Sequence, residues 1–220
     1  MIEVLYEDNH LIAVNKKSGD IVQGDKTGDT PLSDFVKEYI KKKYNKPGEV
    51  FLGTIHRLDR PTSGIVLYAR TSKALSRMNE QFREKKVQKT YWAVVENLPP
   101  NTIDTLDNYL RKNQKQNKSY VTKGDNGKHA VLEYKLLKKL DNFYLLKIKP
   151  QTGRHHQIRV QLANIGCIIK GDLKYGAKRS NKDASIHLLA QKLEFIHPVK
   201  KEPITIVAPT PKDSVWDACK

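Results

Sequence analysis

The chain has 220 residues, of which 38% are hydrophobic, and 40 Lys and Arg oppose 24 Asp and Glu, for a net charge of +16. This excess favours a polyanionic partner, above all nucleic acid or an anionic membrane surface. No stretch approaches the about 18 consecutive apolar residues of a membrane-spanning helix, and the acidic start does not resemble a secretory signal. Two distant cysteines, Cys167 and Cys219, exclude a disulfide framework and predict a reducing cytoplasm.

Hydrophobic periodicity predicts the elements of the first half. Residues 1–15 alternate apolar and polar side chains around a turn, which predicts a hairpin. Residues 31–43 place apolar side chains at helical spacing, with Thr30 as the cap and Pro31 at the first helical position. A strand entry near residue 50, a polar loop at 56–64, an apolar strand at 65–69 and a basic amphipathic helix at 73–86 follow.

The second half is predicted to be mostly strand, with strands at 88–96, 129–137, 143–149, 186–196 and 203–208 and one helix at 156–165. There is no internal repeat and no regular βαβ alternation. The predicted fold class is therefore α+β, with a central mostly antiparallel or mixed sheet flanked by helices and loops. Residues 108–123 carry five basic residues and no acid, which indicates either a solvated loop or a phosphate contact.

The most unusual stretch is His56-Arg57-Leu58-Asp59-Arg60-Pro61-Thr62-Ser63-Gly64. Asp59 stands between two arginines, in a turn-rich loop that leads into an apolar strand. Neighbouring cations favour an ionised carboxylate at neutral pH. Such a carboxylate can attack an electrophilic carbon or accept a proton. The alternative is a structural salt bridge that pins the loop.

A second cluster of donors lies at residues 150–159. Thr152 and Gly153 predict a turn that opens a helix, and the free N–H groups of a helix start favour an anion. We expect a phosphate cradle rather than a metal site, because adjacent histidines on a helix point to different sides. The donors of this cluster are Arg154, His155, His156, Gln157 and Arg159.

A third candidate lies on the strand at 88–96. Alternation puts Lys89 and Tyr91 on one face, and a cation beside an aromatic ring suits base stacking next to a phosphate. The alternative is an ordinary core aromatic. The sequence contains neither GxxxxGK[ST] nor GxGxxG after the first strand, so nothing indicates a nucleotide-driven or hydride-transferring enzyme.

The stretch from His56 to Gly64 resembles the HRLDxxTSG signature of the RluA-type pseudouridine synthases. Four further stretches agree with that family in order and spacing, so the likeness runs from about residue 4 to residue 208. These stretches are Lys89-x-Tyr91, Gly153-Arg154-x-His156-Gln157-Ile158-Arg159, Gly171-Asp172-x-x-Tyr175-Gly176 and Leu193-x-Phe195-x-His197-Pro198.

The resemblance implies a pseudouridine synthase catalytic domain at 1–208, which needs neither a metal nor an organic cofactor. Residues 209–220 are expected to form a C-terminal surface tail, with Trp216 as a docking point. By resemblance, Asp59 is the essential carboxylate, Tyr91 stacks on the target uracil, and Arg159 pairs with Asp59. Arg57 would fill or open the gap in the RNA stack. The residues expected to contact RNA are Arg57, Arg60, Lys89, Arg154, His156 and Gln157.

Several positions depart from the usual pattern of the family. Lys17 stands where proline is common, His155 replaces a small residue, and Gln161 and Leu189 stand where histidine is frequent. These departures bear on RNA contacts more than on the chemistry. We expect no S4-type RNA-binding module, because the first catalytic strand begins almost at residue 1.

The chemistry implied by the family leaves alternatives open. Asp59 can attack C6 of the uracil, attack C1′ of the ribose or promote a glycal, and either Tyr91 or Asp59 can remove the C5 proton. The expected substrate is ribosomal RNA, transfer RNA or both, with a monomer as the default and no protein partner implied. The rival functions are an RNA-binding or ribosome-assembly module without chemistry, and a glycosylase that releases a free base.

Overall fold

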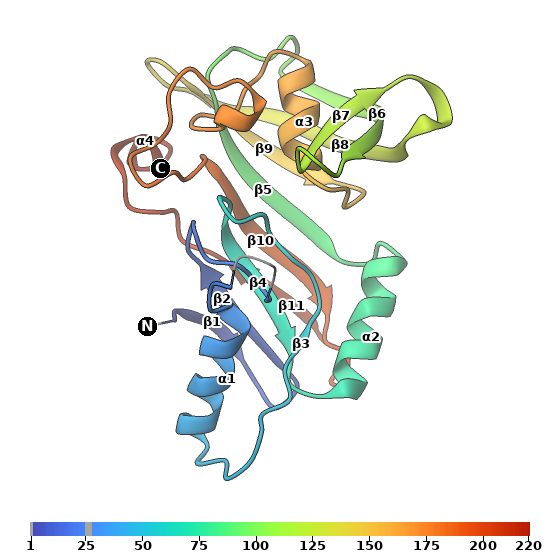
Figure 1. The fold of residues 1–220 in the computed structure, drawn as a ribbon, viewed down its shortest axis with the longest axis vertical. Coiled ribbons are helices and arrows are strands. Elements are labelled where there is room, and N and C mark those ends of the chain that lie inside the picture. The colour runs from blue at the N-terminus through green and yellow to red at the C-terminus, as the bar shows by residue number, and fades with distance from the viewer. Residues whose placement is uncertain (1, 25–27) are drawn as a thin grey trace. The chain divides into compact units, whose positions relative to one another are not determined.

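A computed structural model describes residues 2–24 and 28–220. The chain forms two compact units. Unit 1 consists of Met1–Gln88 with Ala190–Pro209, and unit 2 consists of Lys89–Leu189 with Thr210–Lys220. The chain thus leaves unit 1, builds most of unit 2 and returns to complete unit 1 (Figure 1).

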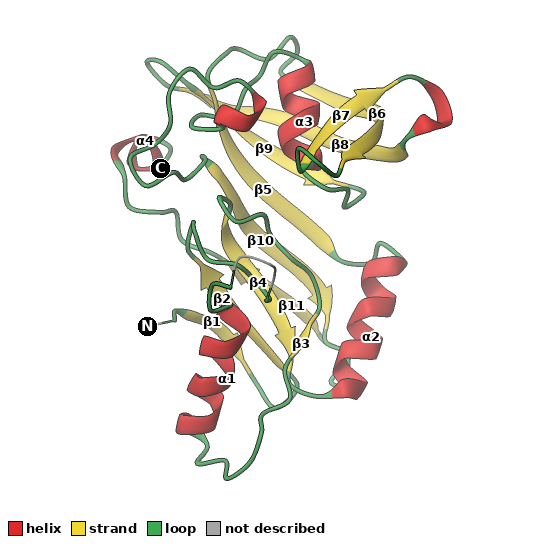
Figure 2. Ribbon diagram, in the orientation of Figure 1, coloured by secondary structure: helices red, strands yellow, loops and turns green. Residues whose placement is uncertain are grey.

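Unit 1 is a sheet with two longer helices (Figure 2). Its strands lie in the order β1-β2-β4-β10, with β3 paired to β4 and β11 paired to β10. The predicted N-terminal hairpin is confirmed by the antiparallel pairing of β1 with β2, although its residue 1 lies outside the described residues. The elements are β1 (Val4–Glu7), β2 (Leu11–Lys16), α1 (Leu32–Lys43), β3 (Gly53–Thr54), β4 (Ser63–Ala69), α2 (Ser72–Arg83), β10 (Leu188–Ile196) and β11 (Pro203–Val207).

The core of unit 1 lies between α1 and the sheet. Val36 and Ile40, one turn apart on α1, pack with Val14 of β2 and Val66 of β4, and all four are buried. Burying each such side chain contributes about 1.5–3 kcal/mol. The predicted helix start is wrong by one residue, because Pro31 occupies the cap position and makes no side-chain cap bond.

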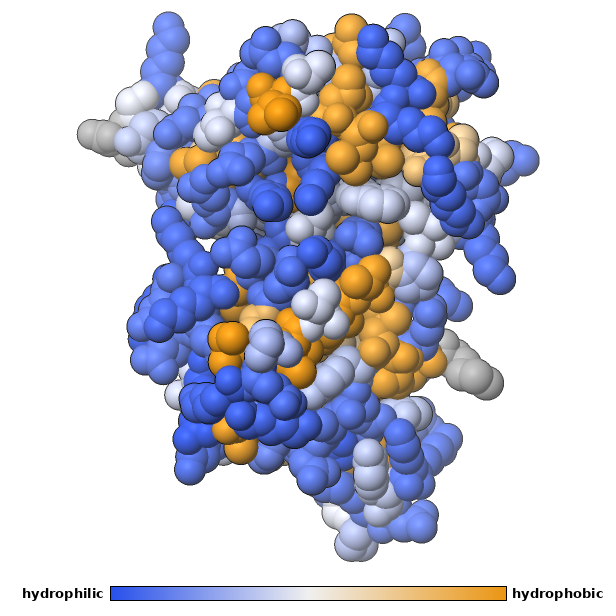
Figure 3. Space-filling view, turned by 180° about the vertical axis from the view of Figure 1, so that it is seen from behind, coloured by the Kyte–Doolittle hydropathy of each residue, from blue (hydrophilic) through white to orange (hydrophobic). Residues whose placement is uncertain are grey.

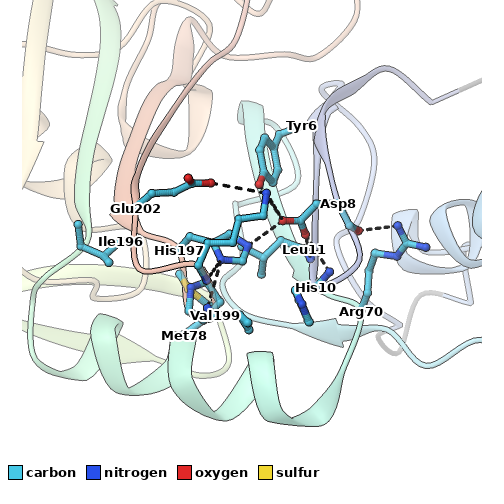
Figure 4. A network of polar contacts seen from close by, with 12 residues as sticks. Tyr6, Asp8, His10, Leu11, Arg70, Met78, Ile196, His197, Val199 and Glu202 are labelled. Carbon is cyan, nitrogen blue, oxygen red and sulfur yellow. Dashed lines mark hydrogen bonds and ion pairs between the residues drawn. The ribbon is translucent and has the colours of Figure 1, made fainter.

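Asp8 ties the β1–β2 turn to the β10–β11 turn within unit 1 (Figure 4). One carboxylate oxygen accepts from the backbone N–H groups of His10 and Leu11, each at 2.8 Å. The other accepts from the Tyr6 hydroxyl at 2.9 Å and from His197 Nε2 at 2.7 Å. Burial raises the pKa of the Asp8 carboxyl, but these hydrogen bonds outweigh it, so the pKa is lowered overall.

His197 is fully buried, and its partners define its tautomer. Nδ1 accepts from the backbone N–H groups of Val199, at 3.1 Å, and Lys200, at 2.8 Å. A nitrogen that accepts carries no proton, so Nε2 carries the hydrogen and donates it to Asp8. The histidine thereby holds the β10–β11 turn in one shape.

The strands of unit 2 pair antiparallel, in the order β5-β9-β8-β6-β7. Its core joins Ala93 of β5, Leu146 of β9 and Leu132 of β8 to Ile158 and Leu162 of α3. The elements are β5 (Gln88–Val95), β6 (Ile103–Asn113), β7 (Lys118–Thr122), β8 (Lys128–Lys139), β9 (Tyr144–Pro150), α3 (Gln157–Asn164) and α4 (Ser214–Ala218), with short 3₁₀ helices at Gly124–Asn126 and Leu173–Tyr175. The two units together confirm the predicted α+β class.

Two expectations for unit 2 need correction. The basic segment at 108–123 is not a loop, because most of it forms the antiparallel β6–β7 hairpin. Trp216 does not lie on the surface, because it is 2% exposed and stacks on His187 with ring centroids 5.3 Å apart, so the segment that carries it is packed against unit 2 at this point. The 1–208 domain boundary with a separate tail stays a prediction.

Hydrophilic residues make up most of the surface that Figure 3 shows. In the described part of the chain, no helix is long and apolar enough to cross a bilayer.

Candidate active site

The loop that carries Asp59 lies in unit 1, between β3 and β4. The backbone N–H of Thr62 donates to the Asp59 carbonyl at 3.0 Å and closes a tight turn directly after the carboxylate. His56, at the start of the loop, accepts from the backbone N–H of Leu67 at 3.1 Å and stacks on Phe82 of α2. Asp59 therefore sits on a short segment that is fastened at both ends.

Lys16, the last residue of β2, stabilises this loop through hydrogen bonds to its backbone. It is fully buried, and its ammonium group donates to the carbonyls of Thr62 at 2.7 Å, Arg60 at 2.9 Å and Lys17 at 3.0 Å. Burial lowers the pKa of the Lys16 ammonium to about 8, against the opposite pull of Asp20 and Asp59. Two of the three hydrogen bonds of this buried cation therefore go to the backbone of the Asp59 loop.

The residues after Lys16 add to this support. Gly19 donates its backbone N–H to the Arg60 carbonyl at 2.9 Å, and the Ser18 hydroxyl donates to the Pro61 carbonyl at 3.2 Å. The side chain of Lys17 points to solvent, so the loss of the usual proline there leaves these contacts in place.

Gly64 shows why the motif ends in glycine. Its φ of +111° is a left-handed conformation, and a Cβ there would stand 2.3 Å from the Ala190 carbonyl oxygen of β10. Only glycine fits, so the exit of the Asp59 loop is locked against the neighbouring strand.

The two arginines that flank Asp59 behave differently. The Arg57 side chain is exposed, whereas Arg60 forms an ion pair with Asp29 at 2.8 Å in which both side chains are half exposed. The sequence did not predict Asp29 as the partner of Arg60.

Lys89 and Tyr91 lie on β5, in unit 2. Both side chains are partly buried, and Tyr91 packs against the buried cluster that contains Ala93. Burial lowers the pKa of the Lys89 ammonium, whose nitrogen lies 4.0 Å from the point where a Cβ on Gly153 would stand. The structure thus brings the Lys89 side chain close to the Gly153 loop, and the predicted phosphate cradle at that loop stays a prediction.

The Gln157 side chain stabilises the Gly153 loop through hydrogen bonds at both ends of its amide group. Its amide oxygen accepts from the Thr152 hydroxyl at 2.7 Å and from the Arg154 backbone N–H at 2.9 Å. Its amide nitrogen donates to the Val131 carbonyl at 3.0 Å, and the side chain is buried. Arg154 is exposed and donates from Nε to the His129 carbonyl at 2.8 Å.

His156 is buried in a left-handed conformation at the start of α3, with a φ of 54°. Its Nδ1 lies 2.9 Å from the Tyr175 hydroxyl. Burial, with Arg159 and His155 nearby, lowers the pKa of His156 to about 2, so the ring is neutral. His156 and Gln157 therefore shape the loop, and their predicted contact with RNA gains no support from their burial.

Arg159, on the first turn of α3, meets Asp172 in a buried two-pronged ion pair. Nε donates to Oδ2 at 2.7 Å, and one terminal nitrogen donates to Oδ1 at 2.8 Å. The expected pairing of Arg159 with Asp59 joins residues of different units and stays a prediction.

Sequence reasoning missed Lys16 and Asp172 as parts of the site. A lysine that shares the face of Ile12 and Val14 on a buried strand was the available signal for Lys16. Asp172 stands in the Gly171-Asp172-x-x-Tyr175-Gly176 stretch, whose spacing alone assigns it no role. Within the described residues, no group of three His, Cys, Asp or Glu side chains is placed to hold a metal ion.

Comparison with known proteins identifies the family. The chain matches the RNA pseudouridylate synthase family over residues 10–164. A ribosomal large subunit pseudouridine synthase C of Buchnera aphidicola is 37% identical over 214 residues, which cover 94% of this chain and 66% of that protein. A tRNA pseudouridine synthase C of Haemophilus influenzae is 33% identical over 226 residues, which cover 94% of this chain and 92% of that protein.

The fold has a counterpart among solved structures. The human RNA Pseudouridylate Synthase Domain Containing 4 superposes with a TM-score of 0.80 at 25% identity, covering 97% of this chain and 90% of that chain. This chain spans just under two thirds of the Buchnera relative's length. The matched segment holds both the Asp59 loop and the start of α3, and the resemblance to RluA-type enzymes is confirmed. The chain belongs to the RNA pseudouridylate synthase family.

Proposed function

We propose that this chain isomerises uridines in structured RNA to pseudouridine, with Asp59 as the essential carboxylate. The observation that carries the proposal is the Asp59 loop, which a buried lysine, a glycine-only exit and a stacked histidine hold in one shape. Such preorganisation is what a reacting carboxylate requires. The sequence relationship to proteins named for this reaction supports it.

The reaction needs no atom from outside. The N1–C1′ bond of uridine breaks, C5 bonds to C1′, and the hydrogen on C5 is replaced while N1 gains a proton. The target base must first leave its stack, at a cost of a few kcal/mol. Stacking on Tyr91 returns about 1–3 kcal/mol of this cost. Arg57, exposed beside Asp59, fills the vacated place in the RNA.

The resemblance to the family makes Arg159 the proposed partner of the Asp59 carboxylate. A dry environment protects the detached base from hydrolysis. The buried strand that follows the loop, Ile65-Val66-Leu67, forms part of that dry wall. Asp59 can begin the reaction in three ways: it can attack C6 of the uracil, attack C1′ of the ribose, or promote formation of a glycal. The proposal holds for each of them.

Ribosomal and transfer RNA are the proposed substrates, because the two named relatives carry those RNAs in their names. The proposed contacts with the RNA backbone are made by Arg57, Arg60, Lys89 and Arg154. The exposed basic residues of the β6–β7 hairpin add to them. We place the protein in the cytoplasm as a monomer, with residues 1–208 as the catalytic domain. Its two cysteines are buried free thiols, which suits a reducing compartment.

Asp59→Asn tests the proposal. Tritium at C5 of uridine, in transcripts of ribosomal and transfer RNA, is released when C5 is deprotonated after the C5–C1′ bond has formed. We expect release to fall by on the order of 1,000-fold or more in Asp59→Asn. Asp34→Asn, an exposed change on α1, is the matched control and should keep the wild-type rate.

Nucleoside analysis of the same RNA separates the rival functions. A synthase leaves the RNA mass unchanged and releases no base, whereas a glycosylase releases free uracil. A binding module forms no pseudouridine and releases no uracil. Wild-type pseudouridine formation by a folded Asp59→Asn protein would contradict the proposed role.

A further inference from the structure

Asp172 lies between Gly171 and the 3₁₀ helix at Leu173–Tyr175, and its side chain is 1% exposed. The function proposed above assigns no role to this buried carboxylate. We propose that Asp172 is a positioning residue, which fixes the plane of the Arg159 guanidinium group for the part that the proposed function gives to Arg159. This inference rests on the proposed function, because Arg159 acts there on Asp59.

The geometry of the pair restricts the arginine. Asp172 takes Nε and one terminal nitrogen of Arg159 at 2.7 and 2.8 Å, through two parallel bonds. A guanidinium group held through two nitrogens cannot rotate about its long axis, and its other terminal nitrogen is directed away from the carboxylate. The Arg159 side chain is 5% exposed, so solvent does not compete for these bonds.

The backbone of Asp172 is held as firmly as its side chain. Its carbonyl accepts from the N–H groups of Tyr175 and Ala177, each at 3.0 Å. Gly171 before it has a φ of +86°, and a Cβ there would lie 2.7 Å from the Asn181 amide and from the Ser185 carbonyl. The carboxylate is therefore presented from a turn that only glycine can precede.

Tyr175 secures the other side of the arginine. Arg159 Cζ lies 5.1 Å from the centre of the Tyr175 ring, a cation–π contact. The hydroxyl of that ring accepts from the backbone N–H of Ser119 on β7 at 2.9 Å and lies 2.9 Å from His156 Nδ1. Lys118, also on β7, lies 5.1 Å from the same ring centre. The guanidinium group is thus enclosed by a carboxylate and an anchored aromatic ring.

Asp172→Asn is the direct test. Asparagine keeps the size of the side chain but sets an N–H₂ group against an arginine N–H. A catalytic group displaced by about 1 Å can lose on the order of 100-fold in rate, so we expect a single-turnover loss of C5 tritium release of that order. Filter binding of the same transcripts should be unchanged. Asp141→Asn, an exposed change on the β8–β9 turn, should match the wild type.

A double-mutant cycle separates positioning from general structural damage. Arg159→Lys keeps the charge but cannot form two parallel bonds. If Asp172 acts through Arg159, Asp172→Asn in the Arg159→Lys background should cost little more. An equal loss in both backgrounds, or a wild-type rate in Asp172→Asn, overturns the inference.

Asp172→Glu keeps the inference testable if Asp172→Asn does not fold. It retains the charge and moves the carboxylate by one methylene, so a folded variant should still be slowed, and a wild-type rate would refute the positioning role. Failure of the proposed function is distinguishable, because it shows as activity in Asp59→Asn. An inactive Asp59→Asn beside a fully active Asp172→Asn refutes only the present inference.

Discussion

At the scale of single residues, the Asp59 loop depends on side chains that never need to touch RNA. Lys16 is buried without a carboxylate among its hydrogen-bond acceptors, which are three backbone carbonyls. A buried cation is costly, and it persists because removing it would leave those carbonyls unsatisfied. Its charge also lies in the field of Asp59.

Lys16→Met should destabilise unit 1 by about 2–4 kcal/mol and slow catalysis, because three backbone carbonyls lose their donor. Urea unfolding followed by circular dichroism measures the loss. Lys17→Met, the exposed neighbour, is the control and should change little.

The difference in stability between the wild type and Lys16→Met should depend on pH. The pKa of Lys16 is about 8 in the folded protein and 10.5 in its ordinary state. Between these values the unfolded chain holds a proton that the native state has released, so native stability rises with pH. The wild type should therefore gain stability relative to Lys16→Met from about pH 8 to about pH 10.5. A constant difference across that window would contradict the burial of a charged Lys16.

At the scale of elements, strong periodicity was a reliable guide. The amphipathic stretch at 31–43 became α1, and the apolar run at 65–69 became the buried strand β4. The β6–β7 hairpin was missed because its tip is almost wholly polar and its inward residues, Leu106 and Leu110, stand four apart. A spacing of four residues does not distinguish a strand from a helix.

The candidate site was predictable only in part. Asp59, Tyr91 and Arg159 stand in short recognisable stretches, so the sequence could nominate them. Lys16 and the Thr62 carbonyl are 46 residues apart, and no local pattern reveals such a hydrogen bond. Asp172 was visible as part of a motif, but its partner became evident only when α3 and the 3₁₀ turn were placed in space.

The β6–β7 hairpin should serve as an electrostatic grip on RNA. Arg111, Lys112 and Lys115 are exposed on it. Replacing all three by glutamine should weaken RNA binding and flatten its salt dependence by roughly 0.7–0.9 in log–log slope for each phosphate that is no longer neutralised. Replacing Lys37, Lys41 and Lys42 of α1 is a control of equal charge. The same slope change in both triple variants would mean that the hairpin has no special part.

At the scale of the whole molecule, the surplus of 16 positive charges suits the proposed RNA substrate and opposes folding. Ionised carboxylates that accept several hydrogen bonds offset part of this repulsion. Glu7 is one: despite burial, which raises its pKa, hydrogen bonds from Lys43, Tyr44 and Tyr39 lower it overall. Asp8 is another.

Acid should therefore unfold the protein by way of these carboxylates. Because the pKa of Asp8 is lowered in the folded state, its contribution is complete above the unfolded value near 3.9 and is lost as pH falls through the folded value. Asp8→Asn should cost about 1–3 kcal/mol at neutral pH and progressively less below about pH 4. Urea unfolding at several pH values tests this, and an equal cost at acidic and neutral pH would exclude it.

The return of the chain to complete unit 1 has a consequence for biosynthesis. β4 is made early, but its neighbour β10 emerges only after nearly all of unit 2. During that interval a wholly buried strand has one side without its partner, apart from the two residues that β3 covers. Such an edge invites pairing with other nascent chains. Translation at low temperature, or with chaperones present, should therefore raise the soluble yield of this protein.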